Sequence, residues 1–320
     1  MKKLLAAALA MSFTGAVHAQ DNLSIVLVPG LTTDAFYITM NKGAQAAADA
    51  LGIKVDFQGA EDFNPTLQIP VLDAVIAREP DAIVIAPTDT TQLIEPLRRA
   101  SDRGIAVVTV DTFIDDGMYQ NGSGEGDFPW SYIASDNVAG GRMAAAAMGD
   151  AMGGKGSVYV SNVRPGISTT DQREEGFKLE MAERYPDITV LDTQYNENDA
   201  STASSQLQAV LARQPDLGGV FGANLFSALG AANGVEAADK LGDITVVAFD
   251  APTSIVDQLK SGLVDMAIAQ HPAEIGYYGV MTAHAHLTGQ SVPPMIGTGF
   301  TVITADNVDE PEIARYIYSD

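Results

Sequence analysis

The sequence predicts an α/β fold with parallel β-sheets arranged in two lobes. Short segments rich in Val and Ile alternate along the chain with longer segments whose apolar residues recur every three or four positions. Strands that are apolar throughout are typical of parallel sheets buried between helices. A second observation is an internal echo, in which one order of motifs occurs twice. The echo divides the chain into two halves that we expect to fold alike.

The first half opens with an apolar strand that leads into an amphipathic helix. After a strand at 24–28, the apolar residues Phe36, Met40 and Ala44 recur on one helical face, which indicates a helix packed on a sheet. The alternation then continues through three further strands and two helices. The strands are expected at 54–57, 82–86 and 106–110, and the helices at 65–78 and 92–103.

The second half repeats this alternation after a polar stretch. The stretch at 115–130 contains several glycines and acidic residues, so we expect a loop inserted between the halves. A last strand is expected at 300–303. The other strands of this half are expected at 157–161, 189–194, 219–222 and 245–249, and the helices at 170–185, 202–213 and 225–241.

The echo places one aspartate at an equivalent point of each half. The sequence AREPD at 77–81 and the sequence ARQPD at 212–216 each precede a strand, and the strand after that one ends at Asp111 or Asp250. Ligands of open α/β sheets bind at the carboxyl ends of the strands, so both aspartates are expected to point into one cleft. Two alternatives stay open. Each aspartate could cap a helix, or the pair could be the acid and base of a glycosidase.

The composition excludes several classes of protein. The 320 residues include 18 Lys and Arg against 41 Asp and Glu, a net charge of −23, which argues against binding to nucleic acid or to an anionic membrane surface. A hydrophobic content of 46% fits a globular protein with a sizeable core. The absence of cysteine excludes disulfides, thiolate metal sites and cysteine nucleophiles.

No motif indicates a cofactor or a metal ion. The glycines at 153–156 precede an expected strand, whereas the glycines of a phosphate-binding loop follow one. His284 and His286 lie two positions apart on an expected helix and therefore point to different faces, which disfavours a shared metal. We therefore expect no cofactor, no metal and no enzymatic activity.

Residues 1–19 have the features of a secretory signal peptide. Lys2 and Lys3 are followed by an apolar stretch at 4–17 and by the small-x-small pattern Val17-His18-Ala19. No other segment is apolar over the length that a membrane span requires. The sequence therefore predicts a protein of the periplasm with no direct membrane anchor.

Several short motifs follow one another between about residues 23 and 289. They are Phe36-Tyr37, Ala86-Pro87-Thr88-Asp89, Ile133-Ala134-Ser135-Asp136-Asn137, Arg173-Glu174-Glu175-Gly176-Phe177 and Ala248-Phe249-Asp250. In this order they resemble the ribose-type periplasmic sugar-binding proteins, which are type I periplasmic binding proteins of ABC transporters. The resemblance implies two Rossmann-like lobes joined by a three-segment hinge. The N-terminal lobe would comprise 20–134 plus 271–298, and the C-terminal lobe 135–270 plus 299–320.

The resemblance also implies how a sugar is held in the cleft. Phe36 and Tyr37 of one lobe would press on one face of the sugar, with Phe249 on the opposite face, because aromatic rings suit the C–H bonds of a pyranose. Carboxylate and amide groups would bind the hydroxyl groups, since together they both accept and donate hydrogen bonds. These polar candidates are Asp111, Asp250, Asn224 and Gln270.

Three further candidates mark where the sequence matches or departs from ribose-binding proteins. Thr112 and Asp171 stand where that family has arginines, whereas Arg173 matches another family arginine. The departures replace cationic groups with smaller or acidic ones, so we expect a ligand other than ribose. An acidic pocket leaves open whether the ligand is neutral or cationic.

The predicted function is that of a periplasmic solute-binding protein of an ABC importer. It would bind a monosaccharide or polyol between the lobes, close by a hinge and deliver the ligand to the membrane permease, acting as a monomer. One alternative is a receptor for chemotaxis or for a furanosyl signal such as autoinducer-2, because the sequence Thr170-Asp171-Gln172 is similar to a stretch of those receptors. The glycosidase is the other alternative.

Overall fold

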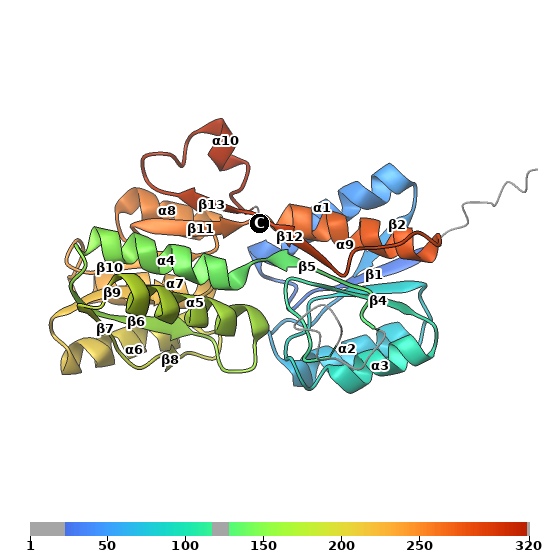
Figure 1. Cartoon of the computed structure of the whole chain (residues 1–320), viewed down its shortest axis with the longest axis horizontal. Coiled ribbons are helices and arrows are strands. Elements are labelled where there is room, and N and C mark those ends of the chain that lie inside the picture. Colours follow the sequence, from blue (N-terminus) through green and yellow to red (C-terminus); the bar gives the residue numbers. More distant parts are fainter. Residues whose placement is uncertain (1–22, 117–127, 319–320) are drawn as a thin grey trace, which may run out of the picture.

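The protein folds into two α/β lobes that lie side by side (Figure 1). The computed structural model describes residues 23–116 and 128–318. The signal peptide predicted at 1–19 and the middle of the loop predicted at 115–130 lie outside these residues. Among the helices within the described ranges, none has both the length and the apolar character needed to cross a bilayer.

The first lobe is built on a six-stranded parallel sheet with the strand order β12-β5-β4-β3-β1-β2. Helices α1 and α9 pack together on one face, and α2 and α3 cover the other (Figure 1). The strands are β1 (Ser24–Val28), β2 (Lys54–Phe57), β3 (Ala82–Ile85), β4 (Ala106–Val110), β5 (Ser131–Ser135) and β12 (Met295–Thr298). The helices are α1 (Ala35–Leu51), α2 (Pro65–Ile76), α3 (Ile94–Asp102) and α9 (Pro272–Leu287).

The second lobe has a seven-stranded sheet in the order β13-β11-β10-β9-β6-β7, with β8 also paired to β6. All pairs are parallel except β11 with β13. Helices α4 and α5 cover one face and α6, α7 and α8 the other. The strands are β6 (Gly156–Asn162), β7 (Ile188–Val190), β8 (Gln194–Tyr195), β9 (Leu217–Gly222), β10 (Thr245–Phe249), β11 (Met266–Gln270) and β13 (Phe300–Ile303). The helices are α4 (Asn137–Ala151), α5 (Ser168–Arg184), α6 (Ala200–Arg213), α7 (Leu225–Ala237), α8 (Thr253–Ser261) and α10 (Pro311–Ala314).

The predicted fold class is confirmed. Most predicted elements agree with the structure within two residues at each end, and two differ more. The strand expected at 189–194 is two short strands, because Thr193 leaves the ladder and its hydroxyl donates to Glu174 over 2.6 Å. The helix expected at 225–241 ends at Ala237. Shortly after this residue, Asp239 adopts a positive φ of 53°, and an α-helix cannot continue through a residue with a positive φ.

The chain passes between the two sheets three times. It leaves the first sheet after β5 and enters α4, returns from β11 into α9, and crosses again between β12 and β13. Gln270 is the last residue of β11, and Gly299 separates β12 from β13. Each lobe therefore combines segments that are far apart in the sequence.

Both faces of the first sheet are buried because its central strands are apolar at every position. In β3, Ala82 and Val84 point to the core under α1 and α9, whereas Ile83 and Ile85 point to the core with α2 and α3. This alternation follows from the two-residue repeat of a strand. The continuous apolar runs that predicted the fold therefore serve two separate cores.

Helices α1 and α9 approach each other so closely that their contact requires glycine. A Cβ atom at Gly43 would overlap the carbonyl oxygen of Ala273, and one at Gly276 would overlap that of Met40. We expect Gly43→Ala to lower the free energy of unfolding by about 2 kcal/mol, because the strain outweighs the gain of about 1 kcal/mol in helix propensity. Urea denaturation measures this change. Gly297→Ala, where a Cβ meets no atom within 4 Å, is the control, and equal stability of the two variants would contradict the prediction.

Candidate functional site

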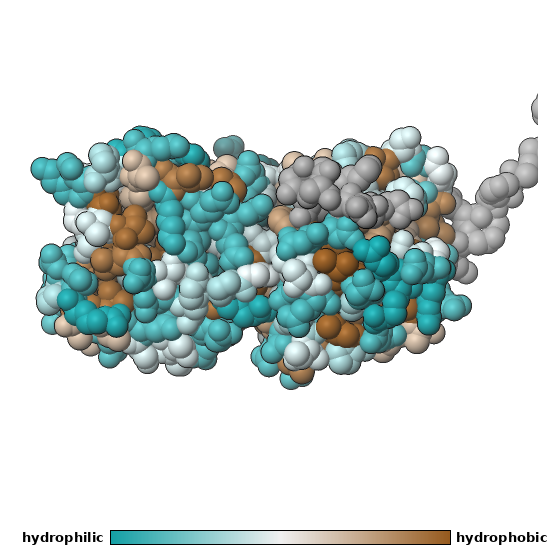
Figure 2. All heavy atoms as spheres, turned by 60° about the horizontal axis from the view of Figure 1, so that its bottom comes forward, coloured by the Kyte–Doolittle hydropathy of each residue, from teal (hydrophilic) through white to brown (hydrophobic). Residues whose placement is uncertain are grey.

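A cavity lies between the two lobes at the carboxyl ends of their strands. On the face that Figure 2 shows, a notch separates the lobes and hydrophilic residues predominate. The cavity is small and is partly enclosed by polar and apolar side chains. Both lobes contribute to its lining, which consists of Leu31, Asp34, Phe36, Tyr37, Phe63, Asp111, Val163, Ile167, Thr169, Thr170, Arg173, Asn198, Asn224, Asp250 and Gln270.

Asp111 follows β4 and faces the cavity from the first lobe. Its φ of 59° lies in the left-handed region, which aspartate tolerates better than most residues. Its backbone is fixed because its N–H donates to Ile133 and its carbonyl accepts from the Tyr132 hydroxyl over 2.8 Å. Its Oδ2 accepts a hydrogen bond of 2.7 Å from the Tyr37 hydroxyl. The strained backbone therefore directs a buried carboxylate toward the cavity.

Asp250 occupies the equivalent position after β10 in the second lobe. Its φ is 77°, and its N–H donates to Ile268. Its Oδ1 accepts two hydrogen bonds of 3.0 Å, from Gln270 Nε2 and from the Tyr318 hydroxyl. The internal echo thus corresponds to two aspartates of like backbone geometry that line one cavity from opposite lobes.

Arg173 supplies the guanidinium of the cavity wall. It is buried on α5, where Nε donates to Asn137 and one terminal nitrogen donates to the carbonyl of Ala223, both over 2.9 Å. The guanidinium carbon lies 3.9 Å from the centre of the Phe249 ring, a cation–π contact. These contacts hold the cation in place beside the carboxylates.

Asp34 is a third buried carboxylate in this cavity, which sequence reasoning did not select. It is the N-cap of α1, and its Oδ1 accepts from the Phe36 N–H over 2.9 Å. Burial, followed by the charge of Asp250, raises its pKa to about 7. Burial also raises the pKa of Asp111 to about 6, against the opposing effects of Arg173 and the Tyr37 hydroxyl. The cavity therefore favours neutral or hydrogen-bonded carboxyl groups.

Two buried oxygen atoms of the lining have no hydrogen-bond partner within the described part of the chain. They are Oε1 of Gln270 and Oγ1 of Thr170. Buried polar atoms are normally paired, because an unpaired one loses its hydration without compensation. A polar ligand in the cavity could pair with both.

Aromatic rings and amides complete the wall. Phe36 and Tyr37 meet edge to face with ring centres 5.1 Å apart, and Phe63 lies in the same lining. Asn224 caps α7 through Oδ1, and its Nδ2 donates to Asn198 over 2.7 Å. Both amides therefore hold fixed orientations beside the cavity.

Three of the predicted site residues do not line the cavity. Phe249 is fully buried in the core with α4 and α5 instead of facing a ligand. Its ring supports the guanidinium of Arg173. Thr112 is turned away, because its hydroxyl donates to the carbonyl of Pro87 over 2.6 Å. Asp171 accepts a hydrogen bond of 2.8 Å from the Gly166 N–H and lies outside the lining. The other seven predicted residues share the lining.

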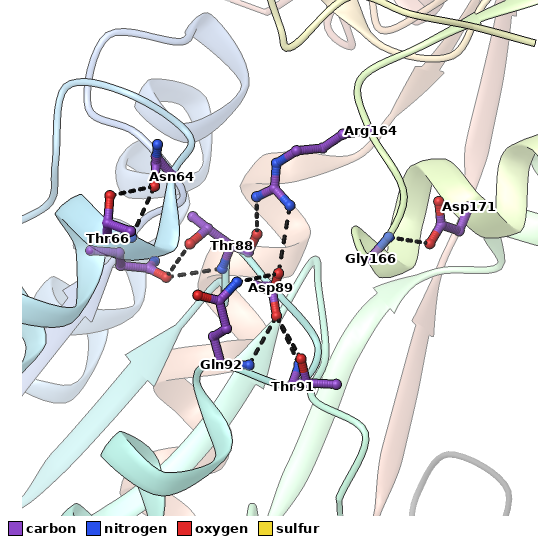
Figure 3. A network of polar contacts seen from close by, with 10 residues as sticks. Asn64, Thr66, Thr88, Asp89, Thr91, Gln92, Arg164, Gly166 and Asp171 are labelled. Atoms are coloured by element: carbon purple, nitrogen blue, oxygen red, sulfur yellow. Dashed lines mark hydrogen bonds and ion pairs between the residues drawn. The ribbon is translucent and has the colours of Figure 1, made fainter.

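A network of polar contacts joins the lobes at the rim of the cavity (Figure 3). Arg164 of the second lobe donates to the carbonyl of Thr88 over 3.0 Å, and its guanidinium lies 3.5 Å from Asp89. Asp89 is held by hydrogen bonds from Thr91 and Gln92. These contacts across the cleft indicate that the lobes are in a closed arrangement.

The charged groups of the cavity are held in fixed orientations by neighbouring side chains. Within residues 23–116 and 128–318, no group of three or more His, Asp or Glu side chains could hold a metal ion. Asp111, Asp250 and Arg173 already have protein partners that fix their orientation. Such preorganised donors and acceptors suit recognition of a small polyhydroxylated molecule.

The chain belongs to the periplasmic binding protein family. The family model, described as a periplasmic binding protein domain, matches residues 25–291. The fold, with two parallel α/β lobes and a cavity between them, agrees with this family and with the predicted resemblance.

Particular relatives are sugar-transport proteins. The ribose import binding protein RbsB of Haemophilus influenzae is 30% identical over 95% of this chain and all of the relative. An ABC transporter solute-binding protein from Agrobacterium vitis, solved with α-D-tagatopyranose, is 68% identical, covers 93% of this chain and 100% of its own, and superposes with a TM-score of 0.90. A carbohydrate transporter protein from Agrobacterium radiobacter, solved with D-arabinose, is 28% identical over 93% and 99% of the chains, with a TM-score of 0.85. These relatives are binding proteins, which agrees with the prediction that this chain is not an enzyme.

Proposed function

We propose that this protein is the periplasmic solute-binding subunit of an ABC importer and that it binds a monosaccharide in the cavity between its lobes. The observation that carries the proposal is the lining itself. It combines aromatic rings, three carboxyl groups, a guanidinium and two oxygen atoms that have no partner among the described residues. Each hydroxyl group of a sugar both donates and accepts, so such a mixed lining can satisfy several of them at once.

The proposed ligand is a ketohexose in its pyranose form, with D-tagatose as the first probe. The relative that was solved with α-D-tagatopyranose shares 68% of its residues with this chain, more than twice the identity shared with the ribose import protein. The three acidic residues of the lining also favour ligands with many hydroxyl donors. Ribose and D-arabinose are the comparison ligands.

The proposed mechanism is closure of two lobes around the sugar. The lobes would be 20–134 plus 271–298 and 135–270 plus 299–320, joined where the chain crosses between the sheets, with a periplasmic location after removal of residues 1–19. Contacts such as Arg164 with Asp89 join the lobes only when they are closed, so a sugar held from both sides shifts the population toward closure. The closed form is then the one that docks on the permease.

The furanosyl-signal alternative has less support. The feature that suggested it was Asp171, and this carboxylate binds the Gly166 N–H outside the cavity lining. A cationic ligand remains compatible with the acidic lining, so an amino sugar belongs in the test.

Calorimetric titration of the mature protein tests the proposal. We expect D-tagatose to bind with a Kd in the micromolar range or below and to raise the melting temperature by mass action. D-Ribose, D-arabinose, an amino sugar, an inositol and autoinducer-2 form the comparison panel. Absence of binding to every monosaccharide in the panel would overturn the proposed function, whereas preference for another sugar would overturn only the choice of ligand.

A further inference from the structure

We propose that Tyr318, near the C-terminus, is a positioning residue of the sugar site that holds Asp250 and Gln270 in their binding orientation. This inference rests on the proposed function. Tyr318 does not line the cavity, and no motif in the sequence pointed to it. Its contacts nevertheless converge on two of the residues that do.

The C-terminal segment brings Tyr318 to the site from a distance in the sequence. After β13 and α10 the chain returns to the end of β10, where the Tyr318 N–H donates to the carbonyl of Ala251 over 2.9 Å. Tyr318 also forms an isolated parallel bridge with Pro252. The backbone of Tyr318 is therefore fastened to the residues that directly follow Asp250, and its side chain is only 1% exposed.

The Tyr318 hydroxyl, Gln270 and Asp250 form a triangle of hydrogen bonds. It accepts from the Gln270 N–H over 2.8 Å and donates to Asp250 Oδ1 over 3.0 Å. The Gln270 side-chain amide donates to the same Oδ1 over 3.0 Å. Two donors thus fix one oxygen of Asp250, which orients the carboxylate so that its other oxygen can accept from a sugar hydroxyl.

The triangle also fixes Gln270. Nε2 of Gln270 donates to Asp250, and its Oε1, in the lining of the cavity, has no hydrogen-bond partner among the residues that the structure describes. Gln270 is the last residue of β11, directly before the chain crosses to the first lobe. The Tyr318 hydroxyl therefore anchors the backbone of a residue that belongs to both the site and the crossing.

The Tyr318 ring reaches the opposite lobe as well. It meets the ring of Phe36 with centres 5.7 Å apart and an angle of 69° between the planes. Phe36 lies on α1 and lines the cavity from the first lobe. Tyr318 consequently contacts cavity residues of both lobes in the closed arrangement, although it does not itself line the cavity.

Removal of the hydroxyl alone tests this role. In Tyr318→Phe the ring is kept, but the buried Gln270 N–H loses its acceptor and Asp250 loses one donor. We expect the affinity for D-tagatose to fall about tenfold or more, with a faster dissociation rate. Calorimetry gives the affinity, and stopped-flow fluorescence gives the rate.

The matched control is Tyr316→Phe, two residues earlier in the same segment. Its hydroxyl accepts from Arg315 and has no contact with Asp250 or Gln270, so we expect unchanged affinity. A purely structural Tyr318 would predict a lower free energy of unfolding with the affinity and dissociation rate of the wild type, and that result would overturn the proposal. The rise in melting temperature caused by the sugar provides a second measure of affinity if the variant is less stable. Failure of the wild type to bind any sugar would instead overturn the proposed function.

Discussion

Asp250→Ala is expected to abolish measurable sugar binding. The substitution removes a carboxylate of the cavity wall and leaves two buried donors, Gln270 Nε2 and the Tyr318 hydroxyl, without their acceptor. Loss of a charged hydrogen-bond partner and desolvation of the orphaned groups together cost roughly 3–5 kcal/mol, which corresponds to more than a hundredfold in Kd. Calorimetry with D-tagatose measures the loss.

The backbone of Asp250 requires a control of its own. Alanine tolerates the φ of 77° less well than aspartate does, so Asp250→Ala also carries a cost in stability. Asp239→Ala is the matched control, because Asp239 is exposed, has a positive φ of 53° and lies outside the cavity lining. We expect this control to lose a similar part of its stability and to keep full affinity. Sugar binding by Asp250→Ala with the affinity of the wild type would show that Asp250 is not part of the binding site.

The sequence was sufficient to predict the fold class because most of the central strands carry their own signal. Continuous apolar runs such as Ala82–Ile85 can be buried only between two layers of helices, and the repeated order of motifs before Asp111 and Asp250 indicated that the halves are alike. Strand β8 is different, because it has only two residues and depends on pairing with β6. Short elements of this kind are defined by tertiary contacts and leave no periodic pattern.

Seven of the ten predicted site residues line the cavity, and those that lie outside it do so for a common physical reason. On helix α5, Thr170 and Arg173 lie three residues apart and share one face, so both reach the cavity, whereas Asp171 points about 100° away. Phe249 and Asp250 are neighbours at a strand end and point to opposite sides. The resemblance identified segments that reach the cavity, but the direction of each side chain depends on the exact element boundary.

The residues that were missed are those whose role depends on distant contacts. Asp34 resembles any helix-capping aspartate in the sequence, and only the closed arrangement brings it near Asp250 of the other lobe. Tyr318 lies 68 residues from Asp250 along the chain. A local motif cannot report such an encounter, so the structure was needed to find both.

Sugar binding is expected to weaken as the pH rises from about 5 to 7. In the closed cavity, burial and the charge of Asp250 raise the pKa of Asp34 from 3.8 to about 7, whereas a solvated aspartate keeps its ordinary value. Between these two values the closed form binds a proton that the open form has released. Because the closed form holds the extra proton, closure and binding lose up to a factor of ten per pH unit in this window. Above about pH 7 the carboxyl is ionised in both forms, and the dependence levels off.

The groups around Asp34 determine how this effect can be isolated. Asp250 and Asp111 both raise its pKa, and the hydrogen bond from the Phe36 N–H lowers it. Asp111, with a pKa of about 6, adds a smaller dependence of the same sign. Asp34→Asn mimics the protonated form and retains an oxygen that can cap α1. We expect this variant to bind at least as tightly as the wild type at pH 7.5 and to lose most of the pH dependence.

Calorimetry at pH 6 in two buffers of different ionisation enthalpy counts the protons directly. The wild type should take up between one and two protons per sugar bound, because at this pH Asp34 is mostly protonated and Asp111 about half protonated in the closed form, whereas both are mostly ionised in the open form. Asp34→Asn should take up much less, with the remainder due to Asp111. Equal proton uptake by the two proteins would assign the effect to another group. A wild-type affinity that is constant from pH 5 to 7 would show that Asp34 and Asp111 stay ionised through closure.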